Sequence, residues 1–82
     1  MLITKDKLKE IGFNIENTNG AFIVLENNIQ IIIRQTSDFA WSIEILYDRN
    51  ENDDEKEYSG SVALPKKFEK IIEVKNLVES LK

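Results

Sequence analysis

Large apolar side chains recur at every second position from residue 39 to residue 47, and this is the clearest hydrophobic pattern in the chain. They are Phe39, Trp41, Ile43, Ile45 and Tyr47. A period of two is typical of a β-strand that is buried on one face only. The segment 39–47 is therefore predicted to be a strand whose aromatic face packs in the core. Core packing is also the favoured role of Tyr58, in preference to a ligand-stacking surface.

Residues 58–64 repeat the alternation, with Tyr58, Gly60, Val62 and Leu64 on one side. Because this segment follows the strand at 39–47 after a short connection, the two are predicted to form a hairpin. The connection, residues 48–57, lies at its tip.

Three more strands are predicted nearer the N-terminus. Residues 21–26 and 29–35 are rich in β-branched side chains and are joined at Asn27–Asn28, a pair that tolerates positive φ and suits a tight hairpin. A short strand over 13–16 precedes them, and residues 17–20 form the turn between.

Helices are predicted at both ends of the chain. Thr4 is an N-cap residue for a short helix that ends at Gly12. Pro65 can occupy the first turn of a second helix, and apolar side chains recur at helical spacing over 66–81. The β-branched pair at 71–72 leaves an alternative open, a strand at 67–72 followed by a shorter helix from Val74.

These elements define one domain, residues 1–82, of the α+β class. The predicted architecture is an antiparallel sheet of four to five strands, with the N-terminal and C-terminal helices packed on one face in the order α-β-β-β-β-α. The helices should cover the aromatic face.

Composition removes several kinds of chemistry. Cysteine and histidine are both absent, which excludes disulfides, thiol nucleophiles and histidine-based acid–base or metal sites. We therefore expect no enzyme, catalytic residue, cofactor or metal site. No apolar run is long enough to span a membrane, and charges from residue 5 onward do not fit a signal peptide, so we expect a cytoplasmic protein.

Charge is concentrated in one place. The chain carries 15 acidic and 11 basic side chains, a net charge of −4, and the segment 48–57 alone contains six carboxylates and two cations. Its acidic residues are Asp48, Glu51, Asp53, Asp54, Glu55 and Glu57. The rest of the chain is electrically balanced, so the whole net charge resides in the predicted hairpin tip.

Three interpretations of this acidic segment are open. It can be a solubilising hairpin tip, or it can bind lysines and arginines of another protein. The third interpretation is a calcium loop, since Asp48-x-Asn50-x-Asn52 begins like an EF-hand. Asp53 then stands where the EF-hand turn requires glycine, and Ser59 stands where its terminal glutamate belongs, which disfavours calcium.

Nucleic-acid binding is disfavoured as well. Arg34 and Gln30 share the polar face of a predicted strand and could contact phosphate, but Ile32 lies on that face and Glu44 is expected nearby. The isoelectric point of about 4.8 also opposes it. Lysines over 66–82 alternate with glutamates, as on a solvated helix surface.

Three parts of the chain carry a resemblance: the capping segment Thr4–Leu8 with Gly12–Phe13, the central Trp41–Ile43, and the C-terminal Leu77 and Leu81. They resemble small uncharacterised proteins of Bacteroidetes genomes and of their phages and mobile elements. That resemblance implies no activity for any residue here. An excess of Ile, Lys and Asn over Arg fits the AT-rich genome of a low-GC bacterium or its viruses.

The expected function is therefore a small non-enzymatic protein-binding domain. A phage- or mobile-element-encoded inhibitor of a basic, nucleic-acid-handling host protein, such as a defence or CRISPR nuclease, fits the acidic segment. The alternative is a structural or oligomeric housekeeping domain with a merely solubilising loop, and a nucleic-acid-binding module comes third. A homodimer through a sheet edge is compatible with either of the first two.

Overall fold

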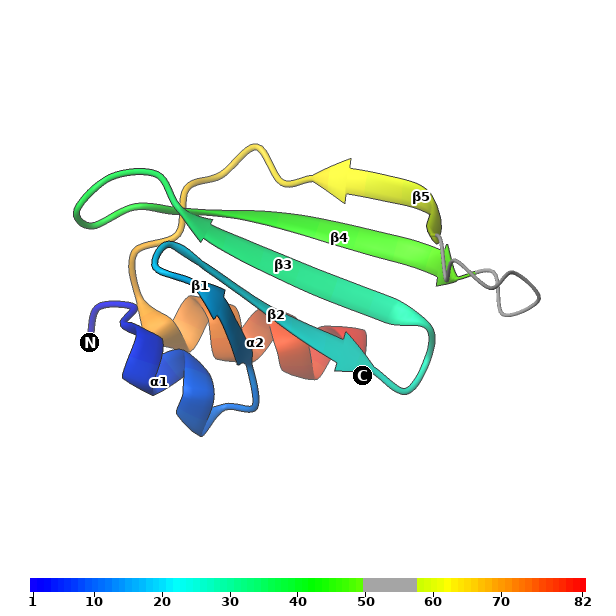
Figure 1. Cartoon of the computed structure of the whole chain (residues 1–82), viewed down its shortest axis with the longest axis horizontal. Helices are drawn as coiled ribbons and strands as arrows, with labels where there is room; N and C mark the ends of the chain where they lie inside the picture. The colour runs from blue at the N-terminus through cyan, green and yellow to red at the C-terminus, as the bar shows by residue number, and fades with distance from the viewer. Residues whose placement is uncertain (50–57) are drawn as a thin grey trace.

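The computed structural model describes residues 1–49 and 58–82. Its elements are α1 (Lys5–Glu10), β1 (Asn14–Asn17), β2 (Gly20–Leu25), β3 (Ile29–Gln35), β4 (Trp41–Arg49), β5 (Tyr58–Ala63) and α2 (Ile71–Leu81). The five strands form one antiparallel sheet in the order of the sequence, and both helices lie on one face of it (Figure 1). The predicted α+β class and two-layer arrangement are confirmed.

The register of the sheet places apolar residues of β2, β3 and β4 opposite one another on the buried face. Ile33 on β3 lies opposite Ala21 on β2 and Ile43 on β4, and Ile31 lies opposite Ile45. All five are buried, because they point toward the helices. The two helices supply Leu8, Val74 and Val78 to the same core, and Phe13, which follows α1, completes it.

α1 begins and ends as its sequence predicts. The Thr4 side-chain oxygen accepts a hydrogen bond from the Lys7 amide at 3.1 Å, which satisfies a free donor at the helix start. Gly12 has a φ of +105°, and the Phe13 amide donates to the Leu8 carbonyl at 2.9 Å. A side chain at Gly12 would be strained, so glycine both ends the helix and turns Phe13 into the core.

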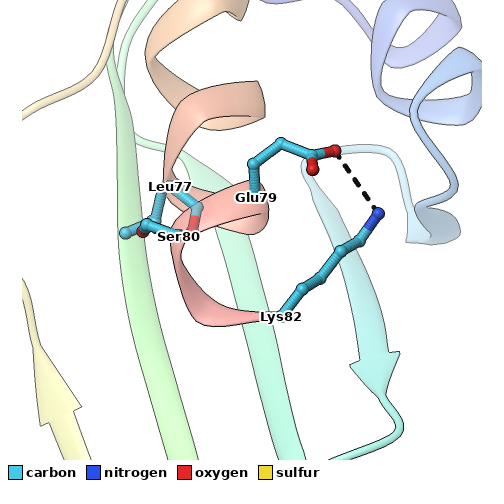
Figure 2. A network of polar contacts seen from close by, with 4 residues as sticks. All are labelled: Leu77, Glu79, Ser80 and Lys82. Carbon is cyan, nitrogen blue, oxygen red and sulfur yellow. Dashed lines mark hydrogen bonds and ion pairs between the residues drawn. The ribbon is translucent and has the colours of Figure 1, made fainter.

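The β2–β3 turn also matches its prediction, with Asn28 at a φ of +64°. The Asn27 side-chain amide donates to the carbonyl of Leu81 at 2.6 Å, so this turn is tied to the end of α2. Figure 2 shows that end of the helix, where Ser80 donates to the Leu77 carbonyl at 2.8 Å and Lys82 pairs with Glu79 at 3.4 Å. The Leu81 carbonyl is one that the last helical turn leaves free, and Asn27 satisfies it.

The prediction of a helix over 66–81 is wrong at its N-terminal end, since α2 begins at Ile71. Phe68 is extended and exchanges two backbone hydrogen bonds with Trp41, both at 2.8 Å. The alternative of a strand at 67–72 is closer for these residues, although the helix starts before Val74. Pairing with the start of β4 satisfies the backbone of Phe68 and buries its ring, and helical periodicity could not reveal that tertiary contact.

The N-terminal segment extends this arrangement by one more strand-like piece. The Ile3 amide donates to the Glu69 carbonyl at 2.9 Å, and the Ile71 amide donates to the Met1 carbonyl at 3.0 Å. Residues 68–70 therefore lie between Trp41 on one side and residues 1–3 on the other. α2 follows residues 68–70 in the chain, and α1 follows the neighbouring residues 1–3.

Glu73 fixes the first turn of α2. Its carboxylate accepts a hydrogen bond from the Lys70 amide at 3.3 Å and pairs with the Lys66 ammonium. The Lys66 ammonium also lies 5.1 Å from the centre of the Phe68 ring. The hydrogen bond from Lys66 is the main reason why the pKa of Glu73 lies below its usual value.

Phe39 corrects the predicted strand at 39–47. It is 61% exposed and lies in the β3–β4 loop, whereas Trp41 at the start of β4 is 3% exposed. Backbone amides of Thr36 and Ser37 donate to the Ala40 carbonyl at 2.9 and 3.3 Å, which closes the loop before the strand begins. Alternation of side chains cannot show where such a loop takes over.

Neither helix in the described ranges, 1–49 and 58–82, is long and apolar enough to cross a membrane. Those two helices instead use their apolar residues to cover the sheet.

Replacing Trp41 by alanine should lower the free energy of unfolding by about 3 kcal/mol or more, because it removes a buried aromatic side chain from a small core. Phe39→Ala is the matched control, and its exposed ring should cost about 0.5 kcal/mol or less. Urea unfolding followed by circular dichroism measures both. Equal losses for the two variants would contradict the orientation of β4.

Glu73→Gln should reduce the acid-side pH dependence of stability. Because folding lowers the pKa of Glu73 from near 4.5, its stabilising effect is complete above that value and is lost as pH falls through the lower, folded value. The variant should melt below the wild type near neutral pH, and the difference should close as pH falls through the lower, folded pKa of Glu73. Glu16→Gln, on β1, is the control, and thermal melts measure both series. A wild-type-to-variant difference that persists in acid would contradict this role.

Candidate protein interaction surface

On the face of the sheet that the helices cover, part of the β4–β5 hairpin is left uncovered. Figure 1 shows α1 and α2 beneath the β1–β3 side of the sheet, with β5 at the opposite edge. On the helix side of the hairpin, Tyr47 is 41% exposed and Val62 is 47% exposed. Val62 on β5 lies directly opposite the buried Ile45 on β4. On this face of the sheet, the side chain on β4 is therefore buried, whereas its partner on β5 is exposed.

Tyr47 and Gly60 form a close side-chain-to-backbone contact within this hairpin. They are cross-strand partners, and a Cβ atom added to Gly60 would lie 2.3 Å from the tyrosine ring. The ring therefore occupies the space that any other side chain at position 60 would need. A larger residue here would force the Tyr47 ring, which covers the backbone of β5, to move.

Asp48 is the one member of the predicted acidic set within the described residues. It is exposed, it has a φ of +55°, and its carbonyl accepts a hydrogen bond from the Ser59 hydroxyl at 3.0 Å. A left-handed backbone at this point is one that aspartate tolerates better than most residues. Asp48 thus lies one residue before the last cross-strand pair of the hairpin, Arg49 and Tyr58.

The other predicted partner-binding residues, Glu51, Asp53, Asp54, Glu55 and Glu57, lie outside the described residues. The two positions at which their segment joins the described structure are known, because Arg49 and Tyr58 are paired residues of β4 and β5. The acidic segment therefore leaves from and returns to the hairpin end that carries Asp48. Whether these carboxylates act together stays a prediction.

β5 is also an edge strand, and its free side is defined by the register with β4. The Leu64 amide donates to the Ile43 carbonyl at 2.9 Å, and Val62 and Gly60 follow in register at every second position. Because backbone groups of an antiparallel strand alternate in direction, the residues between them direct their amides and carbonyls away from β4. These are Ser59, Ser61 and Ala63.

Sequence reasoning identified the acidic tip and allowed a homodimer through a sheet edge, but it did not single out β5. β5 has the sequence Tyr-Ser-Gly-Ser-Val-Ala, without a charged side chain or a proline. Natural edge strands are commonly protected by charge, proline or a bulge. The available signal was an uncharged run of eight residues, 58–65, between an acidic segment and Lys66–Lys67.

The sheet face opposite the helices is mixed in character. Ile32 lies between Phe22 and Glu44 in register, and Arg34, two residues further along β3, lies opposite Ser42. The apolar neighbours and the carboxylate follow the expectation for this face. Arg34 thus lies near apolar side chains and a carboxylate, an arrangement that does not favour contact with phosphate.

No three metal-ligating side chains gather anywhere in residues 1–49 or 58–82. The calcium interpretation depends on Asn50, Asn52 and Asp53, which lie outside those ranges. The expectation that no metal binds therefore stays a prediction.

Replacing Gly60 by alanine should displace the Tyr47 ring, because the new methyl group overlaps it. Nuclear Overhauser contacts between the Tyr47 ring and the residue 60 backbone should disappear, while the free energy of unfolding changes by about 1 kcal/mol or less. Ser61→Ala, at the next position, is the control and should keep the contacts. An unmoved ring in the Gly60→Ala variant would contradict the close approach.

Comparison of the chain with protein family models, curated proteins and solved structures found no match. The resemblance to small proteins of Bacteroidetes and their mobile elements thus stays an expectation, and the surface is interpreted from its own geometry.

Proposed function

We propose that this chain is a small non-enzymatic protein-binding domain that recognises a basic protein through the acidic end of its β4–β5 hairpin. The observation that carries the proposal is the placement of that hairpin. Its described end, with Tyr47 and Asp48 exposed, is covered by neither α1 nor α2. A partner can therefore approach the acidic end without displacing a helix.

Charge supports the same partner class. The whole formal net charge of −4 equals the charge of the segment 48–57. Elsewhere acidic and basic side chains balance, and pairs such as Lys66–Glu73 and Lys82–Glu79 neutralise one another locally. A localised negative potential speeds encounter with a positive surface, and this effect weakens as salt increases.

A basic groove that handles nucleic acid is a partner of this kind, since it is built to attract phosphate charges. We therefore propose an inhibitor that a phage or mobile element encodes and that acts in the host cytoplasm. The absence of histidine and cysteine, together with the small size, supports binding in place of catalysis.

The test neutralises three consecutive carboxylates, Asp53→Asn, Asp54→Asn and Glu55→Gln. Exposed charges contribute little to stability, so the variant should fold as the wild type does. Proteins captured from host lysate by the wild type are identified, and association with the purified partner is measured by surface plasmon resonance. At low salt the variant should associate about tenfold more slowly or worse, with a smaller salt dependence.

The matched control is Glu16→Gln, Glu26→Gln and Asp38→Asn, which changes net charge equally at exposed positions elsewhere. It should keep most of the wild-type association rate. If both triple variants bind as the wild type does at low salt, the acidic segment is not the interface. Equal losses in both would mean that net charge matters and its placement does not.

An oligomeric structural role is the second candidate function, and one observation favours it. Within residues 1–49 and 58–82, the free side of β5 carries unpaired backbone groups and no charge to discourage another strand.

A further inference from the structure

We infer that two copies of this chain pair through their β5 strands, antiparallel, about a two-fold axis at Ser61. This contact is separate from the acidic end of the hairpin and does not depend on the function proposed for it. It joins the two sheets edge to edge into one continuous sheet.

The backbone of β5 fixes the register. Ser59, Ser61 and Ala63 direct their amides and carbonyls away from β4, as the bond from Leu64 to Ile43 establishes. An antiparallel pair centred on Ser61 places Ser59 opposite Ala63 of the second copy, so all three residues bond in both directions. This register gives about six intermolecular hydrogen bonds, and a shift by one residue leaves some of the three unpaired.

The opposite edge of the sheet differs in each property that matters for pairing. β1 has four residues, includes the charged Glu16, and shifts register between Ile15 and Asn17. Beyond Pro65, the side of the chain that continues the β5 edge is already taken, because residues 69–71 bond to residues 1–3. The uncharged stretch 58–63 is thus the one long free edge in the described sheet.

Side chains on the helix side of the hairpin complement one another across this axis. Centring on Ser61 places Val62 of one copy opposite Gly60 of the other. The Tyr47 ring already lies across Gly60, so the incoming Val62 meets that ring. Two side chains that are 41% and 47% exposed in one copy, Tyr47 and Val62, therefore cover each other in the pair.

Nothing in the described fold obstructs the approach. Both helices lie on the β1–β3 side, away from β5 (Figure 1). β5 contains no ionised side chain, so pairing brings no like charges face to face within the strand. A second copy of this strand is accordingly a fitting occupant, by backbone geometry, side-chain contact and charge.

The first measurement is sedimentation velocity of the wild-type chain over increasing concentration, which should show a monomer–dimer equilibrium. Amide hydrogen exchange follows under the same conditions. The amides of Ser61 and Ala63 point away from β4, so they should exchange rapidly in dilute protein and slow as the dimer forms. The Val62 amide, which faces β4, should be protected throughout and serves as the internal control.

The second measurement is a charge exchange at the axis. In Ser61→Lys or Ser61→Glu alone, like charges meet across the axis, and the dissociation constant should rise about tenfold or more. Mixing the two variants pairs Lys with Glu and should restore association. Ser37→Lys and Ser37→Glu make the same changes in the exposed β3–β4 loop and should dimerise as the wild type does.

A chain that stays monomeric at all concentrations overturns the inference. So does a dimer that both Ser61 variants leave intact, or one whose association is not restored by mixing. None of these results touches the Asp53, Asp54 and Glu55 experiment, which reads binding to a different protein. The two proposals can therefore fail independently.

Discussion

The two hydrogen bonds between Trp41 and Phe68 join the three parts of this fold. Each is 2.8 Å long, and both side chains are buried. Trp41 is the first residue of β4 and also pairs with Gln35, the last residue of β3. The pairing of these two strands therefore ends at Trp41. Phe68 leads into α2, and its neighbour Glu69 holds the N-terminal segment that leads into α1. One short extended segment thereby positions both helices against the sheet.

The size of the helical layer explains where the interaction surface lies. An α1 of 6 residues and an α2 of 11 residues cannot cover five strands, and the sheet continues past them to β5. The uncovered hairpin combines two different means of recognition. Its end carries the acidic segment, which acts through charge over a distance, and its edge carries backbone donors and acceptors, which act only in contact. A dimer through β5 would direct the two acidic ends away from each other, because the paired strands are antiparallel.

The sequence predicted the elements well where the local pattern decides them. Thr4, Gly12 and Asn28 hold the cap and turn conformations that their residue types favour, and the alternation at 41–45 identified the buried face of β4. It was wrong where tertiary contacts prevail, at exposed Phe39 and at the start of α2. The prediction that Tyr47 packs in the core is wrong, since its side chain is 41% exposed beyond the helices. The uncharged run that contains β5 is visible in the sequence, but its free side is not, because the outward direction of the Ser61 backbone groups depends on which side β4 occupies. For the acidic set, sequence gives position along the chain, and only Asp48 is placed in space.

The pairing of residues 1–3 with residues 69–71 has a consequence for biosynthesis. The meander from β1 to β4 consists of hairpins between neighbours in sequence, which close quickly because little chain entropy is lost. Met1 and Ile3 instead bond to Ile71 and Glu69, which are far away in the sequence and are translated after the whole sheet. The segment that leads into α1 therefore lacks these hydrogen-bond partners while the sheet is synthesised. The domain closes only when synthesis has passed Ile71.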